Sequence, residues 1–270
     1  MSDLIIPPEY LSLKNTLEEI KAIITEKIAK KDHLIFHACK DIETLYMLKI
    51  GHLEFKIFEV KLNIRKIKKE ILLIQKQINL QKDVDLNFIK NQIELEFEKY
   101  ILELEEKGAK LNLALKRTEL RKLSKEESKE IKKVYKQLIF KLHPDLNENI
   151  TEKEQDLLFK VMDAYEAGDL EKLKVLKVLA SDIPNIVDSG EDTFDKLKEE
   201  IKILKINSEL IDKEIDEIKN SYPYNKKNLI DDEEKLEKNK EILESELEKH
   251  IQEHENYKKR LDDLLKTLNS

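Results

Sequence analysis

The sequence contains very few residues that interrupt helices. Only five prolines and four glycines occur in 270 residues, and no proline lies between Pro8 and Pro144. Because proline breaks a helix interior and glycine weakens it, this interval can hold very long helices. Sheets and barrels need many tight turns, and average glycine usage of about 7% would supply roughly 19 glycines in a chain of this length. We therefore expect an all-α protein.

The charge composition limits the functions that such a protein can have. The chain has 50 basic and 57 acidic residues, a net charge of -7, and 40% charged residues, a composition typical of coiled coils. With a negative net charge, the chain as a whole does not attract nucleic acid or anionic lipid, so any basic surface must be local. The single cysteine, Cys39, excludes an intramolecular disulfide, and the sequence shows neither a secretory signal nor a membrane-spanning stretch. We therefore expect a cytoplasmic protein with no membrane span.

Apolar residues in the first part of the chain follow a coiled-coil repeat. Ten of them alternate spacings of four and three: Tyr46, Ile50, Leu53, Ile57, Val60, Ile64, Ile67, Ile71, Ile74 and Ile78. This seam predicts a left-handed coiled coil roughly 50 Å long. A second apolar series at 93–115 predicts a returning, antiparallel helix, and a helix expected at 9–30 could pack beside the pair. Residues 1–109 form the first predicted domain.

The last block, 193–270, is predicted to form a second antiparallel coiled-coil hairpin. An apolar seam follows 193–220, interrupted only by Ser208, and a second arm at 226–268 follows a turn. Three polar residues interrupt the apolar stripe of this second arm: Lys240, His250 and His254. Because the second arm is longer, its end would stay exposed, contact the rest of the chain, or meet a second copy. Residues 181–192, which are acidic and lack a helical stripe, are predicted to be a linker.

Between the two hairpins, residues 110–180 are predicted to form a small helical domain. Two capping-box sequences, Ser124–Glu127 and Thr151–Glu154, predict the starts of two helices. The first should end at His143, because Pro144 cannot continue a helix. The two antiparallel helices would then be joined by a loop that carries His-Pro-Asp at its tip.

The first helix of this small domain has an apolar face and a basic face. Four lysines recur at helical spacing: Lys129, Lys132, Lys133 and Lys136. Phe140 lies near the same face at 100° per residue. Such a patch attracts an acidic partner surface, although a merely solvated helix face would carry the same lysines. The adjoining loop favours the first interpretation.

The segments IKKVYKQLIFKLHPDLN, 131–147, and LLFKVMDAYEAGDLEKL, 157–173, resemble the J domain of DnaJ-type co-chaperones. In that family, His-Pro-Asp lies between two antiparallel helices. The resemblance implies that the loop and the basic helix face dock on a DnaK-type chaperone ATPase and stimulate ATP hydrolysis. Carried over to this sequence, the partner-binding residues are His143, Pro144 and Asp145 in the loop and Lys132, Lys133, Lys136 and Lys141 on the helix, with Lys129 and Phe140 adjoining them.

The resemblance is incomplete at the start of the domain. The short first helix of the family is not recognisable in 110–123, and the end of the adjoining rod could cover the face that this helix usually covers. Ala164 and Tyr165 match the Ala-Tyr pair of the family, while Leu158 stands where Phe is usual. The glycine/phenylalanine-rich and cysteine-rich regions of larger members are absent, so the chain resembles small J proteins with their own appendages.

No enzyme, cofactor or metal site is predicted. The sequence lacks a glycine-rich phosphate loop, a Ser/His/Asp order and a carboxylate dyad. Two histidine pairs have the spacing of some zinc ligands but no patterned third ligand: His33 with His37, and His250 with His254. We expect no catalytic residues of the chain's own.

The expected function is that of a J-domain co-chaperone whose coiled coils select a client or a location. The partners would be a DnaK-type ATPase and a helical protein or a second copy of the chain. The alternative is a structural or interaction protein whose J-like domain no longer stimulates an ATPase. The intact His-Pro-Asp and the lysine stripe favour the first, since a spacer requires neither. Net acidity and the absence of interleaved aromatic residues disfavour nucleic-acid binding.

Overall fold

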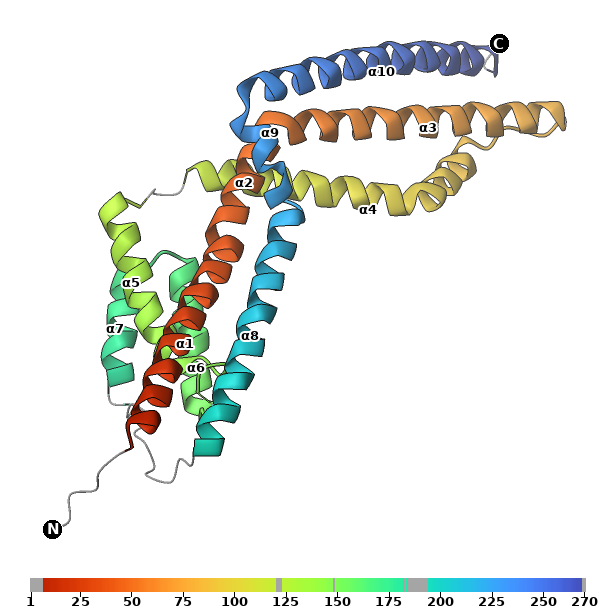
Figure 1. The fold of residues 1–270 in the computed structure, drawn as a ribbon. Coiled ribbons are helices and arrows are strands. Elements are labelled where there is room, and N and C mark those ends of the chain that lie inside the picture. The colour runs from red at the N-terminus through yellow and green to blue at the C-terminus, as the bar shows by residue number, and fades with distance from the viewer. Residues whose placement is uncertain (1–6, 120–122, 148, 182, 184–193, 269–270) are drawn as a thin grey trace. The chain divides into compact units, whose positions relative to one another are not determined.

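The computed structural model describes residues 7–119, 123–147, 149–181, 183 and 194–268 (Figure 1). These residues form helices and connecting segments without strands, which confirms the all-α prediction. The helices are α1 (Pro8–His33), α2 (Cys39–Tyr46), α3 (His52–Asn79), α4 (Leu86–Thr118), α5 (Lys125–Leu142), α6 (Glu152–Glu166), α7 (Leu170–Ser181), α8 (Phe194–Asn220), α9 (Lys227–Asp231) and α10 (Glu233–Leu268). Short helical turns occupy Leu34–Ala38, Met47–Gly51 and Tyr224–Lys226. No helix of the described ranges is both long enough and apolar enough to cross a membrane.

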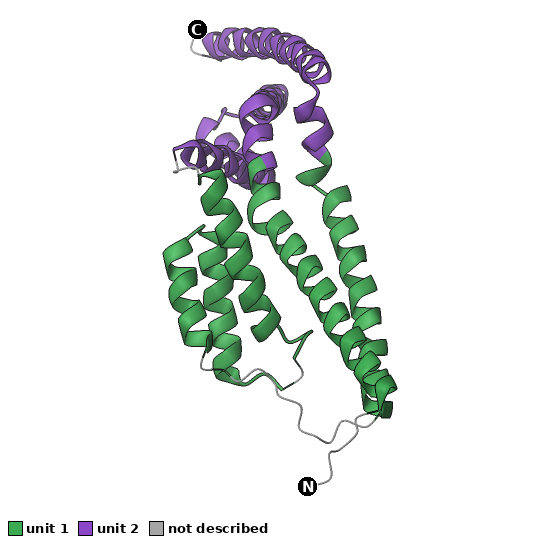
Figure 2. Cartoon of the chain, turned by 60° about the vertical axis from the view of Figure 1, so that its left-hand side comes forward, with its two compact units in different colours: residues 1–41, 121–225 green, residues 42–120, 226–270 purple. Residues whose placement is uncertain are grey.

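The chain divides into two compact units, each built from an early and a late segment (Figure 2). The first comprises residues 1–41 and 121–225, and the second comprises residues 42–120 and 226–270. The predicted domains, 1–109, 110–180 and 193–270, do not coincide with these units, because the long helices pair across the sequence rather than with their neighbours. Of the predicted linker, 181–192, only Ser181 and Ile183 lie within the described residues.

In the first unit, α1 and α8 lie side by side and run parallel (Figure 1). Lys27 donates to Ser208 Oγ at 2.6 Å and Lys31 pairs with Glu214 at 2.7 Å, so the residue numbers rise together along both helices. The serine that interrupts the apolar seam of α8 is thus a hydrogen-bond acceptor for α1. The predicted hairpin of 193–220 with 226–268 is not confirmed, because α8 packs on α1.

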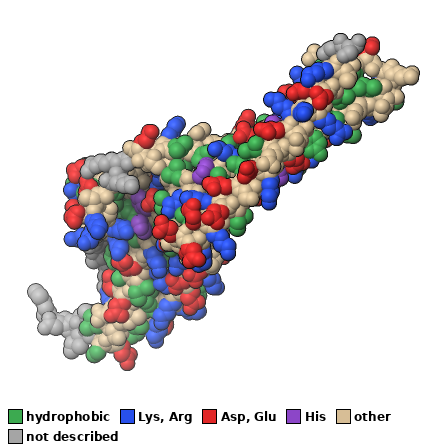
Figure 3. Space-filling model, turned by 90° about the horizontal axis from the view of Figure 1, so that it is seen from above, with side chains coloured by type: hydrophobic (Ala, Val, Ile, Leu, Met, Phe, Trp, Pro, Cys, Tyr) green, Lys and Arg blue, Asp and Glu red, His purple; other side chains and the backbone are tan. Residues whose placement is uncertain are grey.

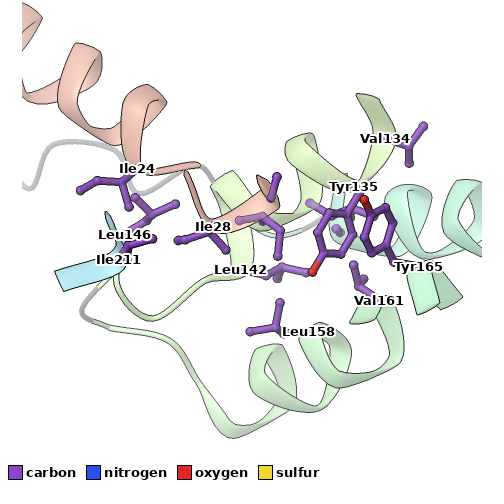
Figure 4. Packing of buried hydrophobic residues seen from close by; sticks show 14 of the residues in the cluster. Ile24, Ile28, Val134, Tyr135, Leu142, Leu146, Leu158, Val161, Tyr165 and Ile211 are labelled. Atoms are coloured by element: carbon purple, nitrogen blue, oxygen red, sulfur yellow. The ribbon is translucent and has the colours of Figure 1, made fainter. Parts of the chain in front are cut away.

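The first unit has one hydrophobic core to which five helices contribute. Its buried residues include Ile24 and Ile28 of α1, Tyr135 and Leu142 of α5, Leu158, Val161 and Tyr165 of α6 and Ile211 of α8 (Figure 4). Leu173 of α7 belongs to the same core. Full burial of one such aliphatic or aromatic side chain contributes about 1.5–3 kcal/mol. Helices α5, α6 and α7 therefore fold together with α1 and α8 rather than as a separate small domain.

Local signals set the ends of the helices around the His-Pro-Asp loop. Ser124 and Glu127 form a reciprocal capping box at the start of α5, with hydrogen bonds of 3.1 and 2.9 Å. Thr151 and Glu154 do the same for α6. The side chain of Asp169 accepts a backbone N–H of α7 at 2.9 Å. The first two caps confirm the predicted starts of α5 and α6, because each depends only on residues a few positions apart.

In the second unit, α3 lies between α4 and α10. Helix α4 is antiparallel to α3, as the sequence pattern predicts, whereas α10 is parallel to α3. The parallel register is fixed by Lys61 with Glu246 at 2.5 Å and Lys68 with Glu253 at 2.8 Å. The third helix beside the α3–α4 pair is therefore α10, and the prediction that the helix at 9–30 fills this place is not confirmed.

The polar interruption of the α10 stripe has a structural role. His250 lies 3.6 Å from a carboxylate oxygen of Glu246 and 3.4 Å from one of Glu253. Since both glutamates also pair with lysines of α3, ion pairs connect the two helices in this part. Acidic and basic side chains are likewise interspersed over the visible surface (Figure 3), so no large field of one sign develops there.

Candidate functional site

The start of the loop between α5 and α6 is fixed by a side chain that caps the end of α5. His143 leaves the helix with an extended backbone, φ -79° and ψ 130°. The side-chain nitrogen Nδ2 of Asn147 donates to the carbonyl oxygens of Phe140, Lys141 and His143 at 3.1, 3.0 and 3.3 Å. The carbonyl of His143 also accepts the backbone N–H groups of Leu146 and Asn147, at 3.0 and 3.1 Å, so Asn147 fixes the position at which the loop departs from the end of α5.

Within the tripeptide, histidine and aspartate have different surroundings. The backbone N–H of Asp145 donates to Nδ1 of His143 at 3.1 Å, and the His143 side chain is only 17% exposed. Burial lowers the pKa of His143; the Asp145 carboxylate opposes this shift, and Lys31 adds to it. The imidazole therefore acts as a neutral acceptor that shapes the loop. The Asp145 side chain is 41% exposed, so its carboxylate is available to a partner, and Pro144 is exposed between them.

Two of the predicted docking lysines contact α1. Lys136 Nζ donates to both carboxylate oxygens of Glu26, at 2.6 and 2.5 Å. Lys132 Nζ lies 3.3 Å from Nε2 of His33. Both contacts run across the antiparallel pair of α1 and α5, and α1 therefore covers one edge of the basic face.

Lys141 is turned toward the other side of α5. Its Nζ donates to the carbonyl oxygens of Ala180 and Ile183 at 3.3 and 3.5 Å, at the end of α7. A cation at a helix C-terminus satisfies unpaired carbonyl groups and interacts favourably with the helix dipole. Lys141 thus stabilises α7, and the structure does not place it with the other lysines.

The remaining predicted residues are open to solvent. Lys129 and Lys133 are exposed, one helical turn apart, and have no hydrogen-bond or ion-pair partner within the described part of the chain. Phe140 is also exposed on α5. We call Lys129, Lys133, Phe140 and Asp145 the open docking residues. Of these four side chains only Asp145 has a polar neighbour among the described residues, His143 Nδ1 at 3.7 Å from its carboxylate oxygen.

A buried polar contact attaches α1 to the two helices of the loop. The hydroxyl of Tyr135 donates to Oδ2 of Asp32 at 2.7 Å, and Tyr165 OH lies 3.5 Å from Nδ1 of His33. Burial raises the pKa of Asp32, while the hydrogen bond from Tyr135 and then Lys31 act against that shift. Burial and the Asp32 carboxylate in turn raise the pKa of Tyr135.

Sequence reasoning missed this contact. The hypothesis that the end of the adjoining rod, α4, covers the face of the absent first J helix is not supported, because α1 packs on α5 in the first unit. A signal was present in the sequence: Ile24, Ile28 and Asp32 follow one another at a spacing of four, which places a carboxylate on an apolar stripe. A charge at such a position needs a partner inside the protein.

The paired histidines do not complete a metal site. His33 and His37 have ring centroids 5.4 Å apart, and burial, followed by the charges of Lys132 and His37, lowers the pKa of His33 to about 4. No group of three or more His, Cys, Asp or Glu side chains in the described ranges could hold a metal ion. Comparison with known protein families, curated proteins and solved structures finds no match for this chain.

Proposed function

We propose that the chain is a J-domain-type co-chaperone that docks on a DnaK-type chaperone through α5 and the following loop and stimulates its ATPase. The observation that carries the proposal is the exposed Asp145 carboxylate, which follows Pro144 at the end of a basic helix. The loop around it is preset by His143 and Asn147, so little ordering is needed when a partner binds.

The chemistry of the open docking residues suits an acidic surface that carries an arginine. A carboxylate at a loop tip can make a charge-assisted, two-pronged contact with a guanidinium group, which fixes the geometry of docking. Lys129 and Lys133 would mainly accelerate encounter with the acidic partner, an effect that weakens as salt rises. Phe140 adds apolar area beside them.

The second unit offers surfaces for a client or for a location in the cell. Phe88, Leu95 and Leu102 of α4 follow one another every seven residues and are 57, 75 and 58% exposed. A stripe of this period fits the apolar face of another helix, from a client protein or a second copy of the chain. The single cysteine and a DnaK-type partner both suit a reducing compartment such as the cytoplasm.

The second candidate function is a structural protein whose J-like segment no longer stimulates an ATPase. The contacts of Lys132 and Lys136 with α1 favour it, because they remove two lysines from the basic face. The two candidate functions differ in their need for the docking residues that do not contact α1. A co-chaperone needs Lys129, Lys133 and Asp145 to bind the partner, whereas a spacer does not.

A binding titration tests the co-chaperone proposal. The full chain is titrated with an ATP-loaded DnaK-type chaperone, and the affinity is followed at low and high salt. Lys133→Glu should weaken binding about ten-fold at low salt, while Lys141→Gln should change it by less than about two-fold. Equal affinities of wild type and Lys133→Glu, or an equal loss of affinity in Lys133→Glu and Lys141→Gln, would count against the assignment.

A further inference from the structure

Helices α1 and α5 of the first unit flank a groove with a volume of about 500 Å³. Ile23 and Ala29 of α1 and Tyr165 of α6 supply apolar surface, and Lys30 and Lys132 are among the lysines that line it. Ligand pockets for small molecules usually have about 300–1,000 Å³ and combine apolar walls with a few polar groups. The groove has the size and the mixed lining of such a pocket.

The groove carries uncompensated positive charge. Of the four lysines that line it, Lys27 pairs with Asp212 at 2.6 Å and Lys136 with Glu26. Lys30 and Lys132 have no carboxylate partner in the part of the chain that the structure describes. Two ammonium groups in one groove repel each other, and an anion between them would remove that repulsion.

The two aromatic residues that line the groove, Tyr165 and His33, are uncharged near pH 7. The ring of Tyr165 is almost fully buried and stacks on Tyr135, with centroids 3.8 Å apart. His33, which also lines the groove, has a pKa of about 4 and is therefore neutral near pH 7. Ile23, which also lines the groove, is about half exposed and offers apolar area to a ligand. These surfaces suit a flat or aliphatic body more than a hydrated inorganic ion.

We propose that this groove binds a small organic anion with an apolar body. The carboxylate or sulfonate of such a ligand would lie between Lys30 and Lys132, and its apolar part would lie against the exposed part of Ile23. The chemistry follows from two cations without carboxylate partners beside apolar side chains: the cations attract and orient the anion, and burial of the apolar part adds affinity. This site does not depend on the co-chaperone function proposed above.

Titration of the full chain with 8-anilinonaphthalene-1-sulfonate, an aromatic sulfonate that fluoresces in apolar surroundings, tests the proposal. We expect one saturable site. Lys30→Glu and Lys132→Glu should each weaken binding about ten-fold, because each replaces an attraction by a repulsion. Lys160→Glu is the matched control: it reverses an exposed lysine of α6 that does not line the groove, and it should change the affinity by less than about two-fold.

Two further measurements test the proposed site. Nuclear magnetic resonance should show that the probe shifts the ring resonances of Tyr165 and His33 and leaves those of His250, in the second unit, unchanged. Inorganic phosphate should compete only weakly, because it lacks an apolar part. The proposal is overturned by the absence of saturable binding up to about 1 mM probe, by equal losses in Lys132→Glu and Lys160→Glu, or by phosphate displacing the probe at equal concentration. Circular dichroism confirms that each variant is folded.

Discussion

The ring of Tyr135 stacks on the ring of Tyr165, with centroids 3.8 Å apart and planes inclined by 13° (Figure 4). The two rings come from α5 and α6, and the Tyr135 hydroxyl reaches Asp32 of α1. An aromatic pair of this kind contributes about 0.5–1.5 kcal/mol beyond the burial of its area. These two contacts of Tyr135 join three helices, and α1 belongs to the same compact unit as the His-Pro-Asp loop.

Replacement of Tyr135 by Phe keeps the ring and removes the hydroxyl. The buried carboxyl of Asp32 then loses its donor, and the free energy of unfolding should fall by about 1–3 kcal/mol in urea titrations. Tyr165→Phe is the control, because its hydroxyl lies 3.5 Å from His33 and should contribute less. An equal decrease in the free energy of unfolding in the two variants would show that the hydrogen bond to Asp32 stabilises the protein no more than the Tyr165 contact does.

Acid should destabilise the first unit through His33. Its pKa falls from the ordinary 6.5 to about 4 because of burial and then the charges of Lys132 and His37. The unfolded chain takes up this proton near pH 6.5 and the folded chain only near pH 4, so stability decreases as the pH falls between these values. Since the ring is partly exposed, the loss should be about 1–2 kcal/mol.

Urea titrations of wild type and His33→Gln at pH 7 and pH 5 measure this contribution. The variant has no proton to take up at this position and should lose less stability between the two pH values. The raised pKa of Asp32 acts in the opposite direction, since the folded chain binds that proton first, so the comparison with His33→Gln isolates the histidine. A pH dependence identical in both chains would refute the role of His33.

Much of the local structure could be predicted from the sequence, because it depends on nearby residues. The capping boxes at Ser124 and Thr151 confirm the starts of α5 and α6. The partner of each long helix could not be predicted, because an apolar heptad seam fits many other seams equally well. The pair of α1 and α8 has polar contacts between residues far apart in the sequence, such as Lys27 with Ser208 and Lys31 with Glu214.

In the candidate site, too, local features could be predicted from the sequence and contacts with other helices could not. The loop and the lysine stripe follow from spacing along α5, but the surroundings of each lysine depend on other helices. Glu26 engages Lys136, and the carbonyls at the end of α7 engage Lys141, and neither contact leaves a periodic signal in α5. Spacing therefore identifies the residues of a helix face, and packing decides which of them stay exposed.

Gly168 occupies a backbone conformation that other residues adopt at a cost. It has φ +68° after the end of α6, and an added Cβ would lie 3.0 Å from Cδ1 of Leu123. Gly168→Ala should lower the free energy of unfolding by about 1–2 kcal/mol. Gly108→Ala is the contrast, because Gly108 lies within α4 and an added Cβ would make only an ordinary contact with Phe55. That variant should be neutral or stabilising by up to about 1 kcal/mol, and a reversed order would contradict the described turn.

Leu261 reports directly on the pairing of α10 with α3. It is 8% exposed in a cluster with Ile71, Ile74 and Phe97, whereas a separate C-terminal hairpin would leave it on the overhanging arm. Leu261→Ala should reduce the stability of the second unit by about 2–3 kcal/mol. Ile242→Ala, at a position 58% exposed on the same helix, should change it by less than about 0.5 kcal/mol. Two equally small effects would argue against the parallel pair.

ATP turnover by a DnaK-type chaperone, measured with and without the full chain, is the most direct test of the co-chaperone proposal. Wild type and Asp156→Asn, which removes an exposed carboxylate from α6, should stimulate turnover equally. Asp145→Asn should leave turnover at its basal rate while unfolding at the same urea concentration as wild type, because the exposed carboxylate makes the contact and does not hold the fold. Stimulation by Asp145→Asn equal to that of wild type, or no stimulation by wild type, would contradict the proposal.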